Sequence, residues 1–390
     1  MKKKLAVCAL AGSCAAPAMA QSSVTLYGVI DEGVNYISNV GGHHLYGMSS
    51  SVLQGSRWGL RGSEDLGGGL KAIFDLQNGF DDGTGQFQQG GDLFGRRAFM
   101  GLASDNWGTV TFGRQYDSVV DYVGAYAAAE QWLGNIGAHA SDIDEMATSY
   151  RANNSVKYAS PTYHGFSFGG LYSFGGVAGS MGTNQIWTLG GKYVAGPVNF
   201  GFAYANIRDP NHSFYGNNAI APAGNLGMTS PIYSGYASAS TEQIIAVGGS
   251  YTFGNAKVGA VYTNIQFRGL GNATVGPTRL ANGTTVANGS SGKFNDAEAN
   301  FSYQLTPALQ LGVAYNYTGE DGIGDAKYHQ VSLGADYALS KRTVVYVVGS
   351  YLHASGTNSQ GVSAVADIQA IAPSASNEQG IVRFGILHLF

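Results

Sequence analysis

Apolar and polar residues alternate along most of the chain beyond residue 20. Between positions 309 and 317 the odd residues are apolar and the even residues are small or polar. The last ten residues repeat the pattern, with Val382, Phe384, Ile386 and Phe390 on one face and only His388 interrupting it. A period of two is typical of a β-strand whose two faces meet different surroundings. The pattern therefore predicts an all-β chain.

Segments with this alternation recur sixteen times. An even number of strands of about ten residues is expected for a closed antiparallel barrel whose tilted strands cross a membrane. The strands are predicted at 23–37, 51–63, 69–80, 93–103, 107–114, 153–160, 165–174, 185–195, 197–208, 241–253, 255–268, 293–304, 308–319, 326–338, 342–354 and 378–390.

The connections between these segments alternate in length. Seven are short and rich in turn residues, such as 104–106, 195–196 and 254–255. The intervening ones are mostly long: 38–50, 81–92, 115–152, 209–240, 269–292 and 355–377. Short periplasmic turns and long extracellular loops are typical of outer-membrane barrels. Aromatic residues near strand ends fit the interfacial girdles of such barrels: Tyr27, Trp58, Phe74, Trp107, Tyr158, Trp187 and Phe301.

The N-terminus predicts export. A basic start at Lys2 to Lys4 precedes an apolar stretch at 5–16, and Ala18-Met19-Ala20 fits a cleavage site. We expect residues 1–20 to be a cleaved signal peptide and 21–390 to form a single barrel domain. Both cysteines lie inside the signal segment, so the mature chain has none for a disulfide, a thiolate nucleophile or a metal site.

Composition and charge fit a membrane barrel. Charged residues make up 12% of the chain, against about 25% in soluble domains. Removing the three signal lysines changes the formal charge from −4 to −7, which argues against a nucleic-acid partner. The histidines lack metal-ligand spacing, so we expect neither an enzyme nor a cofactor.

Parity along the strands places several arginines inside the barrel. Trp58 and Leu60 are expected to face outwards, which turns Arg57 and Arg61 inwards. Arg96, grouped with Ala98 and Met100, and Arg151, grouped with Asn153, Ser155 and Lys157, are also assigned to the lumen. An arginine facing lipid at membrane depth costs roughly 2–4 kcal/mol, which supports the assignment. The alternative places these arginines at strand ends in the headgroup region.

The third long loop, 115–150, is unusually apolar for a solvated segment, and 119–132 could carry a short helix. Such a loop needs a surface that buries its apolar side. The inside of the barrel wall offers one, and the loop would then carry carboxylates toward the arginines. The alternative is a cap on the outer surface.

Several motifs resemble the Gram-negative general porins, especially the β-proteobacterial type. They are Val24-Thr25-Leu26-Tyr27-Gly28, the stretch 55–72, Arg96-Arg97-Ala98-Phe99-Met100-Gly101-Leu102, the stretch 107–115, Asn153-Asn154-Ser155-Val156-Lys157-Tyr158 and the terminal Phe390. The resemblance covers essentially the whole mature chain in matching order. Loops 209–240 and 269–292 carry no recognisable match.

The resemblance implies a homotrimer of sixteen-stranded barrels in the outer membrane, with the third loop folded into each pore. Arg57, Arg96 and Arg151 would form the basic wall of the constriction, with Arg61 a weaker member. Glu130, then Asp121 and Asp117, would supply the opposing carboxylates. The Pro-Glu-Phe-Gly-Gly motif of enterobacterial third loops is absent.

The resemblance also implies roles outside the pore. Arg114, placed outwards by parity with Val110 and Phe112, would receive an acidic residue from a neighbour's second loop, for which Asp81, Asp82 and Asp92 are available. Phe390 would be the signal that the barrel-assembly machinery recognises. Membrane lipid and lipopolysaccharide would surround the barrel.

The function predicted from these features is passive diffusion of small hydrophilic solutes and ions through a narrowed aqueous pore. A substrate-specific outer-membrane channel would have a similar sequence. A barrel that serves as an adhesin through its long loops is the other alternative, although an adhesin does not need arginines in its lumen.

Overall fold

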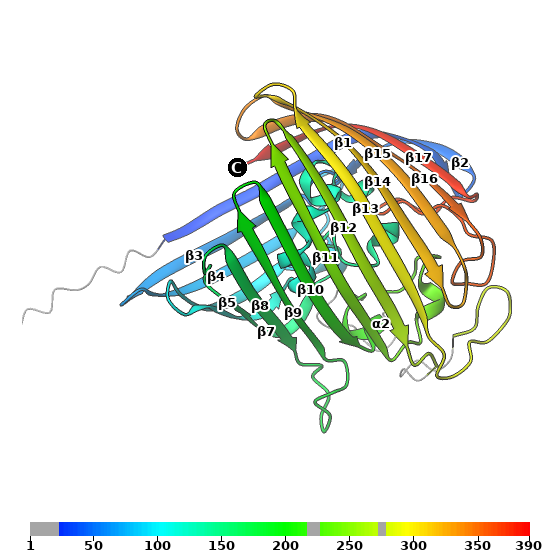
Figure 1. The fold of residues 1–390 in the computed structure, drawn as a ribbon, viewed down its shortest axis with the longest axis horizontal. Helices are drawn as coiled ribbons and strands as arrows, with labels where there is room; N and C mark the ends of the chain where they lie inside the picture. The colour runs from blue at the N-terminus through cyan, green and yellow to red at the C-terminus, as the bar shows by residue number, and fades with distance from the viewer. Residues whose placement is uncertain (1–22, 217–226, 272–277) are drawn as a thin grey trace, which may run out of the picture.

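The computed structural model describes residues 23–216, 227–271 and 278–390. The expected signal peptide and its cleavage site lie outside the described residues. Figure 1 shows an antiparallel sheet that curves round on itself. Its strands within these ranges are β1 Ser23–Val40, β2 His43–Ser50, β3 Arg57–Gly67, β4 Leu70–Gly79, β5 Arg97–Ser104, β6 Gly108–Gln115, β7 Ala152–Ala159, β8 Phe166–Ser173, β9 Ile186–Ala195, β10 Val198–Arg208, β11 Thr241–Phe253, β12 Ala256–Arg268, β13 Gly292–Gln304, β14 Leu309–Asp321, β15 Lys327–Ala338, β16 Thr343–Ser355 and β17 Glu378–Leu389.

The sheet closes into a barrel because its last strand pairs with its first. β17 runs antiparallel to β1 from the pair Val29 and Leu389 to the pair Ile37 and Ile381. β2 and β3 both pair with β1, β2 along its second half and β3 along its first half. They therefore lie end to end and act as one strand. The described chain forms a closed barrel of sixteen strands, as predicted.

The prediction of a loop at 38–50 was wrong. β1 continues to Val40, and β2 returns along it after a tight turn at Gly41 and Gly42. Both glycines have positive φ, 57° and 97°, a conformation that a side chain disfavours. The rings of Tyr36 and Tyr46 face each other across the hairpin at 5.1 Å. The predicted strand at 51–63 is correspondingly displaced and begins at Arg57.

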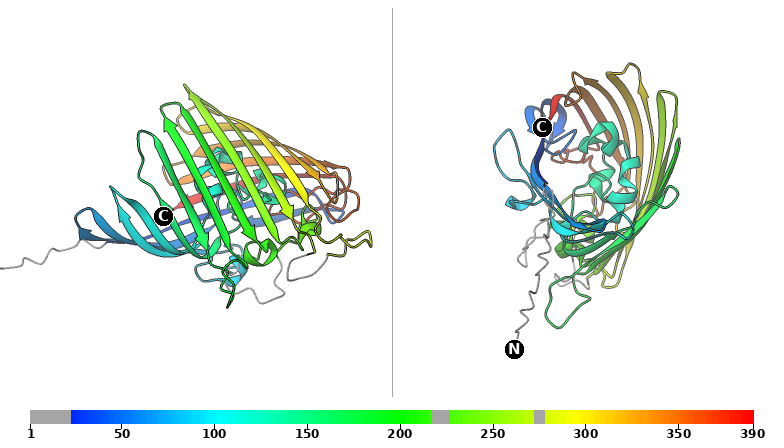
Figure 2. Two further views of the ribbon diagram at one scale, coloured as in Figure 1. Left: turned by 60° about the horizontal axis from the view of Figure 1, so that its bottom comes forward. Right: turned by 90° about the vertical axis from the view of Figure 1, so that its left-hand side faces the viewer.

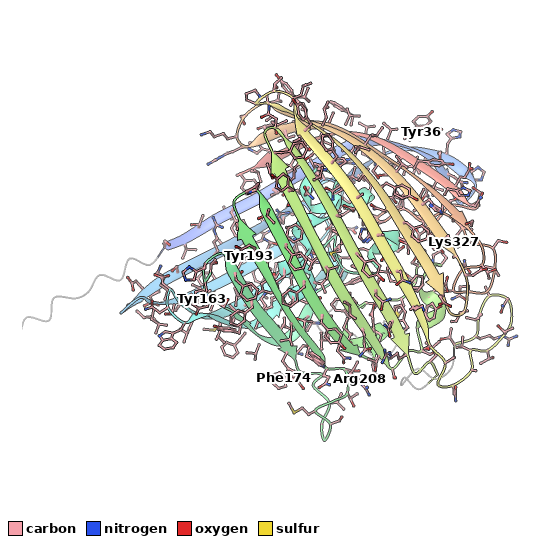
Figure 3. The ribbon with its side chains drawn as sticks, in the orientation of Figure 1. Tyr36, Tyr163, Phe174, Tyr193, Arg208 and Lys327 are labelled. Carbon is pink, nitrogen blue, oxygen red and sulfur yellow. The ribbon has the colours of Figure 1, made fainter. Side chains whose placement is uncertain are left out.

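The two faces of the wall differ as the alternation predicted. In β17, Val382, Phe384 and Ile386 are about half exposed on the outside, whereas Ile381 and Leu387 are buried inside. Figure 3 labels outward aromatic residues near both barrel ends, among them Tyr193 beside a short turn and Phe174 beside a loop. Tyr27 does not belong to this girdle, because its hydroxyl points inwards and donates to Asp75.

Residues 116–151, hereafter the constriction loop, fold into the barrel. Figure 2 shows their helical turns, in teal, enclosed by the wall. Instead of one helix over 119–132, the loop has five short turns: α1 Ser118–Tyr122, η2 Gly124–Tyr126, η3 Ala129–Leu133, η4 Asn135–Gly137 and η5 Ala140–Asp142. Further helical turns lie in other loops, η1 at Gln89–Gly91, α2 at Pro210–Ser213 and η6 at Ser234–Tyr236. Among the described residues, no helix is long and apolar enough to cross a membrane.

Glycines on the inner wall make room for the constriction loop. A methyl group at Gly169, Gly190 or Gly201 would overlap Tyr122 of α1. On the opposite side of the loop, the indole of Trp132 covers Gly312 in β14 and Gly334 in β15. Glycine here removes side-chain bulk where a second chain segment approaches the sheet closely. The loop therefore packs directly on the backbone of the wall.

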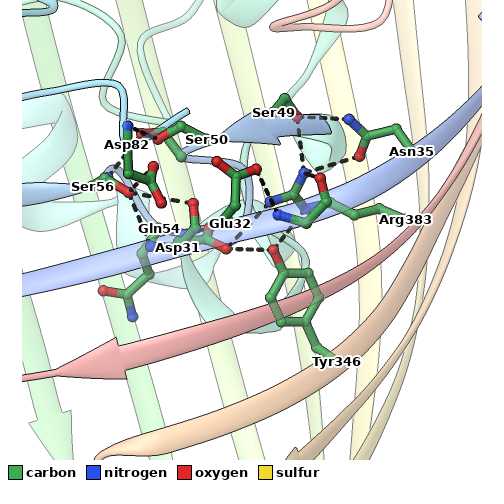
Figure 4. A network of polar contacts seen from close by, with 12 residues as sticks. Asp31, Glu32, Asn35, Ser49, Ser50, Gln54, Ser56, Asp82, Tyr346 and Arg383 are labelled. Carbon is green, nitrogen blue, oxygen red and sulfur yellow. Dashed lines mark hydrogen bonds and ion pairs between the residues drawn. The ribbon is translucent and has the colours of Figure 1, made fainter. Parts of the chain in front are cut away.

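A buried polar network joins the first and last strands (Figure 4). Arg383 of β17 is fully buried, and its Nε donates to Tyr346 Oη at 2.7 Å. Its Nη1 donates to Asn35 Oδ1 at 2.9 Å and to Ser49 Oγ at 2.8 Å, while Nη2 lies 3.5 Å from Asp31 Oδ1. A buried charge is tolerated only when it is paired and hydrogen-bonded. The network thus links β1, β2, β16 and β17 where the barrel closes.

Candidate pore constriction

The constriction loop leaves a polar cavity of about 1060 Å³ between itself and the wall. Side chains of β1, β3, β4 and the segment before β5 line one side of the cavity, and residues of the constriction loop line another. The charged side chains among the lining residues are Arg57, Arg96, Arg97, Arg151, Glu130 and Asp336. Counting side chains alone, four arginines against two carboxylates give a formal excess of two positive charges.

Three expected arginines of the basic wall line this cavity, and two of them meet on one tyrosine. Arg96 Nε donates to Gln77 Oε1 at 3.0 Å, and its Nη2 donates to Tyr116 Oη at 3.0 Å. Arg151 Nη2 donates to the same Tyr116 oxygen at 2.6 Å. The Arg57 guanidinium is held by its own loop, through the carbonyl of Gly55 and the amide oxygen of Gln54.

A fourth arginine, Arg97, joins the cluster and was missed. Its Nη1 lies 3.4 Å from Asp75 Oδ2, and its guanidinium carbon lies 5.2 Å from the centre of the Tyr116 ring. Adjacent residues of a strand point to opposite faces of the sheet. Arg96 lies just before β5, which begins at Arg97, so the alternation does not decide where the Arg96 side chain points. Met100, which parity grouped with Arg96, is 65% exposed on the outside, so that grouping was wrong.

Arg61, the weaker candidate, lies apart from the cluster. Its guanidinium carbon stacks over the Tyr27 ring at 5.1 Å, and its side chain is exposed. It does not border the described cavity. The structure therefore brings Arg57, Arg96 and Arg151 together and leaves Arg61 outside the group.

Glu130 is the expected acidic residue that the structure places at the cavity. It is exposed there, accepts a hydrogen bond from Thr148 Oγ1 at 3.4 Å and interacts electrostatically with Arg96, Arg57 and Arg151. Asp336 of β15 also borders the cavity and was missed, because nothing in the sequence distinguishes it from other inward polar residues. The two carboxylates come from different elements.

The other two acidic candidates do not line the cavity, which corrects the expectation for both. Asp117 caps α1 by accepting from the backbone N–H groups of Val119 and Val120 at 2.7 and 3.3 Å. Its burial raises the pKa of the carboxyl to about 6, against the opposing effect of these N–H groups. Asp121 lies 2.6 Å from Lys157 Nζ in an ion pair. Both carboxylates are thus held by other partners and do not border the cavity.

Arg114 is held within its own chain in this structure. Its Nε donates to the carbonyl of Gly95 at 2.7 Å, its Nη1 donates to Asn153 Oδ1, and Asp92 interacts with it electrostatically. The register of β6 against β7 shifts between Gly113 and Gln115, which breaks the alternation from which its outward direction was argued. Its contact with a neighbouring subunit stays a prediction.

The remaining aspartates of the second loop and the terminal aromatic residue have intrachain contacts as well. Asp81 Oδ1 accepts from Thr84, and Asp82 Oδ1 accepts from Ser56 Oγ at 3.1 Å. The backbone of Phe390 exchanges two hydrogen bonds with Gly28, at 3.0 and 3.1 Å. The terminal residue therefore extends the pairing of β17 with β1, and its role in assembly stays a prediction.

A buried ionic cluster fastens the constriction loop to the opposite wall. His139 Nδ1 lies 2.6 Å from Asp144 Oδ2, and His139 Nε2 lies 3.3 Å from Glu298 Oε2 of β13. Burial alone would lower the pKa of His139, but the two carboxylates outweigh it and raise that pKa well above its ordinary value. Ligand atoms of His139, Asp144 and Asp296 lie within 4.8 Å of one another. Because carboxylates face both ring nitrogens, the cluster fits an imidazolium better than a metal ion.

The arrangement can act on the charge of a solute without any covalent step. Charged groups from the wall and from the loop face one narrowed, water-filled space. In such a space protein charges act on a passing ion more strongly than in bulk water. The geometry therefore suits selection among diffusing ions.

Comparisons with known proteins agree with this geometry. A model of the Gram-negative porin family matches residues 5–357. An outer membrane porin protein of Bordetella pertussis is 34% identical over 389 residues, covering 90% of this chain and 94% of the relative. Outer membrane porin protein 32 of Delftia acidovorans is 30% identical over 410 residues, covering all of both chains. Among solved structures, an anion-selective porin from Comamonas acidovorans has a TM-score of 0.71 at 25% identity, covering 95% of this chain and 100% of that one.

Proposed function

Because the chain belongs to the Gram-negative porin family, we propose that its constriction sorts solutes by charge and favours small hydrophilic anions. The protein is a channel of the bacterial outer membrane, through which small hydrophilic solutes and ions diffuse passively, and it is not an enzyme.

The observation that carries the proposal is the excess of arginine over carboxylate around one cavity. Arg57, Arg96, Arg97 and Arg151 border it, against Glu130 and Asp336. Although the mature chain is acidic, charges more than about 8 Å from an ion are largely screened at physiological salt. The local charge of the constriction therefore outweighs the net charge of the chain. The solved porin from Comamonas acidovorans is described as anion-selective, which supports the same preference here.

Opposed charges also produce a field across the pore. Glu130 of the loop and the arginines of the wall interact across the cavity. A transverse field orients dipolar solutes and disfavours apolar ones. We therefore expect the channel to be general for small polar solutes, with charge as its main criterion.

Reversal potentials across planar bilayers in a salt gradient test this assignment. The combined replacement Arg57→Gln, Arg96→Gln and Arg151→Gln is expected to shift the reversal potential toward that of a cation-selective pore. An unchanged potential would refute the role of these arginines. Saturable block of the conductance by one solute would instead identify a substrate-specific channel.

We extend the proposal to a homotrimer. β5 to β8 have eight residues each, fewer than the 9–11 of a tilted strand that crosses the hydrocarbon core. Their outward side chains include the exposed Met100, Leu102 and Phe112. A low, apolar stretch of wall suits contact with neighbouring subunits better than contact with lipid alone. Light scattering of the detergent-solubilised protein should give three times the mass of one mature chain.

The remaining partners follow from export and membrane insertion. We propose that residues 1–20 are removed, that Phe390 is recognised by the barrel-assembly machinery, and that lipid and lipopolysaccharide surround the outward face. Sequencing of the mature N-terminus should begin at Gln21. Deletion of Phe390 should lower the yield of folded barrel in the outer membrane while refolding in detergent is retained.

A further inference from the structure

Tyr116 occupies the centre of the arginine cluster. Its phenolic oxygen accepts hydrogen bonds from Arg96 Nη2 at 3.0 Å and from Arg151 Nη2 at 2.6 Å. The guanidinium carbons of Arg151 and Arg97 lie 4.7 and 5.2 Å from the centre of its ring. The side chain is 4% exposed and borders the cavity. Three arginines of the cavity thus converge on one phenol.

The hydrogen bonds of this phenol are unusual in direction. A guanidinium has only donors, so both arginines must use lone pairs of the phenolic oxygen. A neutral phenol also carries a proton that needs an acceptor, and the hydrogen bonds of the described residues give it none. A phenolate needs no acceptor and gains two charge-assisted bonds. The surroundings therefore favour the deprotonated form more than an ordinary protein surface does.

We propose that Tyr116 is a selectivity-determining residue: its oxygen holds Arg96 and Arg151 together and, when the phenol loses its proton, cancels one positive charge of the arginine wall. The inference rests on the proposed function, because it assumes that the wall sets the ion preference. The phenolic proton passes to water in the cavity, and no other group changes its bonding.

Electrostatics support this role. Burial alone would raise the pKa of Tyr116, but the charges of Arg151, Arg96 and Arg97 outweigh it and lower that pKa to about 8. The phenolate fraction then rises from roughly a tenth at pH 7 to roughly nine-tenths at pH 9. Over this range the positive excess of the cavity falls by nearly one charge.

Other charged groups also face Tyr116. The groups near its side chain, its backbone or its cavity are Arg57 of β3, Asp75 of β4, which pairs with Arg97, Arg96 and Arg97 at the start of β5, Arg114 of β6, Arg151 and Lys157 beside or within β7, Asp117 and Glu130 of the loop, and Asp336 of β15. Arginines keep their charge throughout the physiological range. The pKa of Asp117, raised to about 6 by its burial, lies below the range in which the phenol titrates. The arginines and Asp117 therefore keep their charges while Tyr116 loses its proton between pH 7 and 9.

The test measures reversal potentials in a salt gradient between pH 6 and pH 9.5 for the full channel and for Tyr116→Phe. We expect the anion-to-cation permeability ratio of the natural channel to fall about two-fold around pH 8. Tyr116→Phe should lack the fall in this ratio that is centred on pH 8. Tyr122→Phe is the matched control, because Tyr122 lies in the same loop and its burial raises its pKa to about 12. The permeability ratio of this control should fall around pH 8 as it does in the natural channel.

A second measurement keeps the inference testable if Tyr116→Phe does not fold. The ultraviolet absorbance of the natural channel at the tyrosinate band should rise around pH 8 by the amount expected for one phenolate per chain. No rise below pH 9, or the same pH dependence of selectivity in Tyr116→Phe, would overturn the inference. If the triple arginine replacement shifts selectivity while these tests fail, only the role of Tyr116 is refuted.

Discussion

His139 Nε2 of the constriction loop lies 3.3 Å from Glu298 Oε2 in the barrel wall. The other ring nitrogen faces Asp144 Oδ2 at 2.6 Å. All three side chains are almost completely buried. Glu298 Oε1 also accepts from the backbone of Ala128 at 2.7 Å, which ties a second point of the loop to β13. One histidine thus connects the loop that narrows the pore to the wall behind it.

Replacing this histidine should release the loop. His139→Gln leaves the carboxylates of Asp144 and Glu298 buried without their cation, which costs about 3–5 kcal/mol when one partner of a buried ion pair is removed. We expect noisier single-channel currents and a lower melting temperature. His43→Gln, at an exposed position of β2, should leave both unchanged. Quiet currents in His139→Gln would show that other contacts hold the loop.

The same cluster predicts how the loop responds to pH. The pKa of His139 is raised, so its stabilising contribution is fully present below its ordinary pKa of about 6.5 and is lost as pH rises through the higher, folded value. Burial alone would raise the pKa of Asp144, but His139 outweighs it and lowers that pKa. The contribution of Asp144 is therefore present above pH 3.8 and lost as pH falls through its lower, folded value. Current noise should stay low between pH 4.5 and 6.5, and noise that rises within this range would contradict the ion pair.

The indole of Trp132 depends on a gap left by two wall glycines. A Cβ at Gly334 would lie 2.8 Å from Trp132 Cε3, and one at Gly312 would overlap the same ring. Gly334→Val should therefore push η3 and Glu130 into the pore and change the single-channel conductance. Gly349→Val on the adjacent β16 is the control, because Gly349 lies opposite the outward Leu333. Equal conductance in the two variants would refute the role of this gap.

The strands could be predicted from the sequence because their signal is local. Alternation sets the two faces of each strand, and turn residues mark the ends, so sixteen strands and most of the connections between them follow without tertiary information. The failures came where the regular geometry breaks. The β1–β2 hairpin was missed because both faces of β2 are largely exposed, and Arg97 was missed because β5 starts one residue after Arg96.

The contents of the pore were less predictable, because a loop takes its shape from the surface that it packs on. Nothing in the sequence separates Glu130 from Asp121 as a carboxylate of the pore. In the structure Lys157 pairs with Asp121, whereas Glu130 borders the cavity. The glycines of the wall are a signal of this packing within the sequence. Gly169, Gly190, Gly201 and Gly334 fall at inward positions of their strands and mark the surface where the loop lies.

The two acidic residues should therefore differ in their effect on selectivity. Glu130→Gln removes one of the two carboxylates that border the cavity, which strengthens the positive excess. We expect the anion-to-cation permeability ratio to rise, as measured by reversal potentials at neutral pH. Asp121→Asn should leave the ratio near its natural value, because Asp121 is engaged by Lys157. The reverse result would assign the constriction to Asp121.

The pairing of β1 with β17 should become less stable when the charge balance of the buried polar network beside it is broken. Arg383→Met removes the cation that pairs with buried Asp31 and takes a hydrogen-bond donor away from several polar side chains (Figure 4). The expected cost is about 3–5 kcal/mol. Heat-induced loss of the folded band in detergent gels should occur at lower temperature. Arg342→Gln, at an exposed turn, should behave as the natural protein does.

Closure of the barrel also depends on the space at Gly28. A Cβ at this position would lie 2.7 Å from the carbonyl oxygen of Arg57 and would overlap the ring of Phe390. Overpacking of this kind costs roughly 1–3 kcal/mol. Gly28→Ala should therefore slow refolding and lower the fraction of folded barrel, as followed by the shift of the folded band in unheated gels. Gly47→Ala is the matched control, because the nearest atom to its Cβ is Leu45 Cγ at 4.0 Å. If both variants fold equally well, the terminal ring can move aside, and the contact of Phe390 with β1 contributes little to closing the barrel.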